Sequence, residues 1–130
     1  MNEYTQPFSH DARSVTQARR FVRQNLEELP PDLRDAVEMM VSELATNCVL
    51  HTESDFTVHL EQTADELRVE VSDSGRGRPV LRPPDPTSIS GRGLRTVEML
   101  SDAWGVQPHS DAPGKTVWFT VTLSEVAQGA

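Results

Sequence analysis

Apolar residues in the first half of the chain recur at helical spacing. Over Asp11–Leu29 they lie three or four residues apart, which predicts an amphipathic helix. The positions of this stripe are Val15, Ala18, Val22, Leu26 and Leu29. Pro30 and Pro31 end the run, and Pro31 suits the first turn of a second helix. That second helix should extend to about Leu50 or His51.

Alternating apolar and polar residues predict strands elsewhere in the chain. The expected strands are a short edge strand at Tyr4–Phe8 and further strands at Phe56–Glu61, Leu67–Val71, Val106–Pro108 and Thr116–Leu123. A third helix is expected over Gly91–Ala103, with Trp104 on its apolar face. Short turns join most of the strands, so the sheet should be mixed and mainly antiparallel. The expected fold class is therefore α+β, a two-layer sandwich with about three helices on one face of the sheet.

Composition narrows the kind of protein. The chain has 130 residues, a net charge of −8 and a pI of about 4.9. We expect one domain, residues 1–130, and a charge of this sign disfavours nucleic acid and anionic membranes as partners. No apolar run approaches the ~18 residues of a transmembrane helix, and the N-terminus lacks a secretory pattern. A lone cysteine, Cys48, excludes an internal disulfide, so a cytoplasmic location is expected.

Two polar residues border the apolar stripe of the second helix. Glu43 and Asn47 are four residues apart, so they lie one above the other on the helix surface. Their common direction is about 110° from the centre of the stripe. The stripe itself consists of Val37, Val41, Leu44 and Cys48. A carboxylate and an amide at this border could line a pocket wall, and the alternative is a solvated flank with an ordinary Glu–Asn hydrogen bond.

Two glycine-rich motifs follow. The first contains Asp73, Gly75 and Gly77 and comes directly after a predicted strand, which puts an acceptor and open backbone at the end of the sheet. The second starts the third helix, where backbone N–H groups favour an anion. Its residues are Gly91, Arg92, Gly93 and Leu94. A plain turn and a flexible helix start are the alternatives for the two motifs.

Three other patterns do not support a site. Pro113–Thr116 resembles the end of a phosphate-binding P-loop, but the required earlier glycine is His109 and the next segment is a predicted strand. Arg76–Pro79 matches the core of a minor-groove AT-hook, against the acidic charge of the chain. Cys48 and His51 provide only two ligands, too few for a zinc site.

The motifs together resemble one known family. They are E-x-x-x-N at Glu43 and Asn47, D-x-G-x-G at Asp73, Gly75 and Gly77, G-R-G-L at Gly91–Leu94, and G-K-T at Gly114–Thr116. In this order and spacing they resemble the GHKL (histidine-kinase-like) ATPase fold of gyrase, MutL and histidine kinases. More narrowly, the chain is similar to the bacterial anti-sigma-factor serine kinases of the RsbW type, and the resemblance covers nearly all of it.

The resemblance implies a role for each motif. Asn47 would hold Mg²⁺ through its amide oxygen, and Glu43 would be the general base. Asp73 would accept a hydrogen bond from the adenine amino group, in a pocket shaped by Gly75 and Gly77.

Further roles follow from the same resemblance. Residues Arg78–Ser90 would form a lid over ATP, and Thr116 would help to fix the adenine edge. The G-R-G-L motif, which includes Arg92, would bind the phosphates, with backbone N–H groups presented by Gly91, Gly93 and Leu94.

The function implied is that of a Mg-ATP-dependent serine/threonine protein kinase and anti-sigma factor. Its expected partners are a small anti-sigma-factor antagonist, phosphorylated on serine, and a sigma factor. Because family members commonly dimerise, a homodimer is also expected. The alternative is a catalytically silent ATP-binding module that binds a protein partner. A third hypothesis, minor-groove DNA binding through Arg76–Pro79, conflicts with the net charge of −8.

Overall fold

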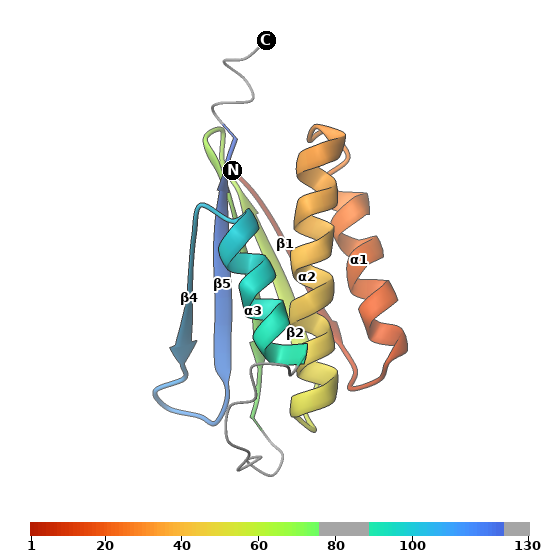
Figure 1. Ribbon diagram of the computed structural model, residues 1–130, viewed down its shortest axis with the longest axis vertical. Coiled ribbons are helices and arrows are strands. Elements are labelled where there is room, and N and C mark those ends of the chain that lie inside the picture. The colour runs from red at the N-terminus through yellow and green to blue at the C-terminus, as the bar shows by residue number, and fades with distance from the viewer. Residues whose placement is uncertain (76–88, 124–130) are drawn as a thin grey trace.

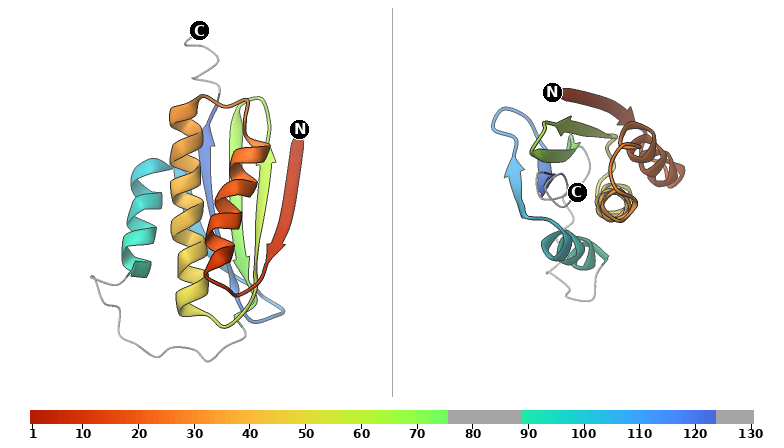
Figure 2. Two further views of the ribbon diagram at one scale, coloured as in Figure 1. Left: turned by 90° about the vertical axis from the view of Figure 1, so that its right-hand side faces the viewer. Right: turned by 90° about the horizontal axis from the view of Figure 1, so that it is seen from above.

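Helices and strands form two layers (Figure 1). The computed structural model describes residues 1–75 and 89–123, with the backbone alone for residues 89–93. The elements are β1 (Asn2–Phe8), α1 (Arg13–Asn25), α2 (Pro31–His51), β2 (Phe56–Gln62), β3 (Glu66–Asp73), α3 (Ile89–Leu100), β4 (Ala103–Pro108) and β5 (Lys115–Thr122). Figure 2 shows the three helices on one side of the sheet, which confirms the predicted α+β sandwich.

The sheet has five strands in the order β1-β2-β3-β5-β4. All four neighbouring pairs are antiparallel, so the mainly antiparallel sheet predicted from the short turns is confirmed. β3 lies at the centre and pairs with β2 on one side and β5 on the other. In the sequence, α3 and edge strand β4 lie between β3 and β5. In the sheet β3 and β5 are neighbours, so the end of β3 lies beside the start of β5.

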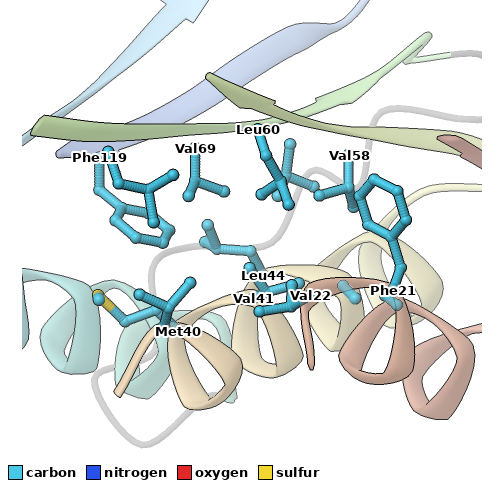
Figure 3. Packing of buried hydrophobic residues seen from close by; sticks show 14 of the residues in the cluster. Phe21, Val22, Met40, Val41, Leu44, Val58, Leu60, Val69 and Phe119 are labelled. Carbon is cyan, nitrogen blue, oxygen red and sulfur yellow. The ribbon is translucent and has the colours of Figure 1, made fainter. Parts of the chain in front are cut away.

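One face of the sheet is buried beneath the helices. Along β3 the buried residues are Leu67, Val69, Val71 and, at its end, Asp73. Because side chains alternate between the two faces of a strand, the carboxylate of Asp73 continues the row of core side chains. Figure 3 shows Val69 and Phe119 of the sheet facing Met40, Val41 and Leu44 of α2. The core therefore leads directly to a buried acid at the end of the central strand.

An ion pair fixes α1 against α2. Glu38 of α2 is 4% exposed. Its carboxylate accepts hydrogen bonds from Nη2 and Nε of Arg23 of α1, at 2.8 and 3.2 Å. Arg19 lies 3.8 Å from the same carboxylate. The flank of α2 that carries Glu38 is thus the flank that faces α1.

The C-terminal ends of two helices, α1 and α3, come earlier than predicted. α1 ends at Asn25, short of the predicted Leu29, because the chain turns with the Leu29 N–H donating to the Leu26 carbonyl. α3 ends at Leu100, whereas Ala103 was predicted to be helical, and Trp104 belongs to β4, where it lies opposite Phe119. Pairing with β5 determines the structure of this segment, although the spacing of its apolar residues suits a helix. None of the described helices is long and apolar enough to cross a membrane.

Phe119 is fully buried and its neighbour Trp118 lies on the open face of the sheet, where the Arg68 guanidinium covers its ring at 4.5 Å. Phe119→Ala should lower the free energy of unfolding by about 3–5 kcal/mol, because it leaves a cavity between sheet and helices. Trp118→Ala, the matched control, should cost less than half as much. Urea titration measures both values, and equal losses would contradict the assignment of the two faces.

Candidate functional site

The buried acid at the end of β3 is paired with a lysine. Nζ of Lys115, the first residue of β5, donates to Oδ2 of Asp73 at 3.0 Å. The Asp73 side chain is 3% exposed and that of Lys115 is 46% exposed. Lys115 has the same alternation as the buried Val117 and Phe119, so it lies on the helix-facing side of the sheet with Asp73. Among the described residues, no other group hydrogen-bonds to this carboxylate.

Two glycines bring the strand ends together. Gly75 has φ +60° and Gly114 has φ +105°, conformations that favour glycine. A Cβ on Gly75 would lie 2.5 Å from the Gly114 nitrogen, and one on Gly114 would overlap the carbonyl oxygen of Asp73. The backbone after β3 therefore touches the backbone before β5, and this contact fixes Asp73 relative to Lys115.

A pocket of about 300 Å³ opens beside the ion pair. Asp73 and Lys115 form its charged wall, and Val106 and Pro108 of β4 form an apolar wall. His51, at the end of α2, also lines it. An apolar slot with a few polar groups at one side is the usual form of a small-molecule site. Its volume and its lining, apolar on one side and charged on the other, suit a small molecule that carries hydrogen-bonding groups.

Three polar residues of α2 follow one another toward the pocket. Glu43, Asn47 and His51 are spaced four apart, so they form a row along the helix. Oδ1 of Asn47 and Nε2 of His51 are buried and have no hydrogen-bond partner in the described part of the chain. Buried polar atoms normally have a partner, so these two atoms are candidates for contact with a ligand.

The row of polar residues faces away from α1. Asn47 comes nine residues after Glu38. At about 100° per residue the two side chains are about 900° apart around the helix axis, which is two full turns and a further half turn. Since Glu38 faces α1, Asn47 lies on the opposite flank, where α2 packs against α3. Figure 1 shows the N-terminal end of α3 beside the C-terminal half of α2. The unpartnered amide and the start of α3 are therefore at the same end of the molecule.

Cys48 connects α2 with the buried acid. Burial raises the pKa of the Cys48 thiol to about 12, and the negative charge of Asp73 contributes to the increase. The thiol is 7% exposed and belongs to the core, as the apolar stripe predicted. The Asp73 carboxylate is therefore close enough to Cys48, the residue that follows Asn47, for its charge to act on the thiol.

Not all of the predicted residues meet at this pocket. The structure brings Asp73 and Gly75 to it and places Glu43 and Asn47 on the adjoining helix. Thr116 lies on the other face of the sheet, where its Oγ1 bonds to Oγ of Ser72 at 2.8 Å and to Nε2 of His109 at 3.1 Å. Because consecutive strand residues point to opposite faces, Thr116 lies on the face opposite Asp73, and its role at the adenine edge stays a prediction.

The second glycine motif lies in α3. The helix begins at Ile89, so Gly91, Arg92, Gly93 and Leu94 occupy its first turns. The last two residues of the predicted lid, 89 and 90, are helical as well. Gly77 and lid residues 78–88 lie outside the described part of the chain. The first turn of any α-helix has backbone N–H groups without a partner inside the helix and is the positive end of the helix dipole, as an anion site requires.

Two residues of the pocket were missed by the sequence analysis, Lys115 and His51. The signal for His51 was its place four residues after Asn47, which continues the row on α2. The signal for Lys115 was alternation, because it shares a face with the apolar residues of its strand whereas Thr116 does not.

Comparison with known proteins agrees with this geometry. Residues 8–121 match the model of the histidine kinase-like ATPase domain. The chain belongs to this family. The match covers most of the chain and shows an ATPase domain, which implies that the domain binds ATP. A search of curated proteins gives no significant match.

Among solved structures, this ATPase domain is similar to the RsbU and RsbW domains of Rv1364c from Mycobacterium tuberculosis. The TM-score is 0.70 and the identity 17%, over 93% of this chain. At this identity the likeness is one of fold. The chain spans about a third, 32%, of that protein chain.

Gly114→Ala should separate the two strand ends. Alanine at φ +105° costs about 1–3 kcal/mol, and its Cβ must also push the Asp73 carbonyl away. We expect at least ~2 kcal/mol of lost stability in urea unfolding. Gly105→Ala is the control, since the three atoms nearest to its Cβ all belong to the Trp118 side chain rather than to the backbone. A larger loss for the control would show that the backbone contact at Gly114 is not tight.

Proposed function

We propose that this domain is a Mg-ATP-dependent serine/threonine protein kinase that phosphorylates a small anti-sigma-factor antagonist and also acts as an anti-sigma factor. The observation that carries the proposal is the unpartnered Oδ1 of Asn47, one helical turn from Glu43 and near the Asp73 pocket. Asn47 provides a ligand atom for a metal ion, Glu43 a base, and Asp73 an acid that binds the ring, all in one region of the domain.

Asn47 is suited to a magnesium ion. Mg²⁺ prefers hard oxygen ligands, and a buried amide oxygen without a partner is such a ligand. The residues present therefore fit the ion, which when bound would neutralise charge on the ATP phosphates. Glu43, half-buried on the same row, adds negative charge near this position.

Asp73 is suited to the adenine ring. Its buried carboxylate accepts a hydrogen bond from the exocyclic amino group of the base, and Val106 and Pro108 contact the ring. Gly75 keeps the backbone close to the base. At the start of α3, Gly91 and Gly93 leave backbone N–H groups open to the phosphates, which the positive helix end also attracts.

Glu43 is the proposed general base. As the serine oxygen of the partner attacks the γ-phosphorus, the Glu43 carboxylate takes the hydroxyl proton. A new O–P bond forms, the bond from the γ-phosphorus to the β–γ bridging oxygen breaks, and ADP leaves. Phosphoryl transfer depends mainly on positioning and charge neutralisation, so one base and a well-held nucleotide are sufficient.

The partners are proposed from the RsbW likeness. They are a small antagonist protein that carries the target serine, a sigma factor, and a second copy of this chain in a homodimer. The net charge of −8 argues for protein partners and against nucleic acid or anionic membranes. The domain would work in the cytoplasm, where sigma factors act.

A second candidate function is a silent ATP-binding module. The base pocket around the Asp73–Lys115 ion pair is compatible with it, because binding a base requires no phosphate transfer. In that case nucleotide binding would only change the shape presented to a partner. The two functions differ in whether phosphate is transferred.

Asn47→Ala should weaken Mg-ATP binding by at least ~10-fold, because one charge-assisted contact to the ion is lost. Calorimetry with Mg²⁺, and again with EDTA, measures the change. Asn25→Ala is the matched control. Its amide donates to the Phe21 carbonyl at the end of α1, away from the pocket, so affinity should be unchanged. Unchanged affinity in Asn47→Ala would remove the residue from the site.

Glu43→Gln should leave ATP affinity within ~3-fold and reduce phosphate transfer by at least ~100-fold, since the shape remains and the basicity is lost. The assay follows radiolabelled phosphate from ATP to a co-purified partner protein at saturating nucleotide. Glu28→Gln, exposed between α1 and α2, is the control with the same charge change. Equal rates for wild type and Glu43→Gln would exclude Glu43 as the base. No transfer by the wild type, with ATP and partner bound, would favour the silent module.

A further inference from the structure

Lys115 brings a charged donor to the wall of the pocket. An ammonium group has three N–H donors, and in the described part of the chain the Asp73 carboxylate accepts one of them. The remaining donors belong to a side chain that is 46% exposed and lines the pocket. A base that enters displaces water from this ammonium group, so the group needs a new acceptor.

The ion pair presents an acceptor and a donor next to each other. Asp73 Oδ2 and Lys115 Nζ are 3.0 Å apart. Adenine offers the complementary pattern, because its exocyclic amino group is a donor and each ring nitrogen that flanks it, N1 or N7, is an acceptor. One carboxylate alone recognises only the amino group. A carboxylate with an ammonium beside it recognises two neighbouring atoms of the same edge.

The backbone contact at Gly114 fixes the arrangement of the two charged groups. Gly114 directly precedes Lys115 and touches the carbonyl region of Asp73, which sets the distance between the acid and the lysine. The apolar residues Val106 and Pro108 line the same pocket, so a flat ring held against them would meet both charged groups at its edge.

We infer that Lys115 is a second base-recognising residue. It donates to the adenine ring nitrogen beside the amino group, while Asp73 accepts from the amino group itself. The role rests on the proposed binding of ATP, and it goes beyond the single carboxylate assigned above. An ion pair that is only structural would make no such contact.

Adenine analogues test the contact on the full chain. In 1-deaza-ATP and 7-deaza-ATP a C–H group replaces N1 or N7, and the amino group remains. One analogue should bind the wild type about 10-fold more weakly than ATP, because a charge-assisted hydrogen bond is lost, and the other should bind like ATP. In Lys115→Met, ATP and the sensitive analogue should bind alike, since the donor is gone.

Controls separate the outcomes. Lys115→Arg keeps a cationic donor and should keep the difference between ATP and the sensitive analogue. Arg20→Met removes an exposed charge that does not line the pocket, and it should change no ratio. Equal binding of ATP and both analogues to the wild type overturns the inference even if Lys115→Met is unfolded. A loss that persists in Lys115→Met also overturns it. Failure of the wild type to bind ATP at all overturns the proposed function, and the inference with it.

Discussion

The packing of α2 against the central strands is the contact on which the rest of the molecule depends. It buries one face of the sheet, and the row of buried side chains on β3 ends in the carboxylate of Asp73. The same helix carries Glu43 and Asn47 on the flank opposite its ion pair with α1. A single helix–sheet contact therefore orients both the acid of the sheet and the amide of the helix.

The order and type of the elements could be predicted because each has strong periodicity. Helix ends could not. At Ala103 and Trp104 the spacing suits a helix, yet pairing with β5 supplies backbone hydrogen bonds that the sequence pattern does not show. The spacing of apolar residues describes one segment at a time, whereas the pairing of two strands depends on both segments.

The candidate site shows the same limit. Glu43 and Asn47 were predictable as a pair because they are one helical turn apart. The Asp73–Lys115 ion pair joins residues far apart in the chain, and it requires the pairing of β3 with β5 and the contact between Gly75 and Gly114. The G-K-T motif also does not show on which face Thr116 lies, because a shift of one residue along a strand moves the side chain to the other face.

The outer strands of the sheet have a consequence for assembly. β1 and β4 are the two edges, and each carries a proline, Pro7 and Pro108. Proline has no N–H to donate, so it interrupts the row of backbone groups that an added strand would need. Continuous growth of the sheet from chain to chain is therefore hindered on both sides. A strand added at either edge would lose a backbone hydrogen bond at the proline, so side-chain contacts gain weight in any association at these edges.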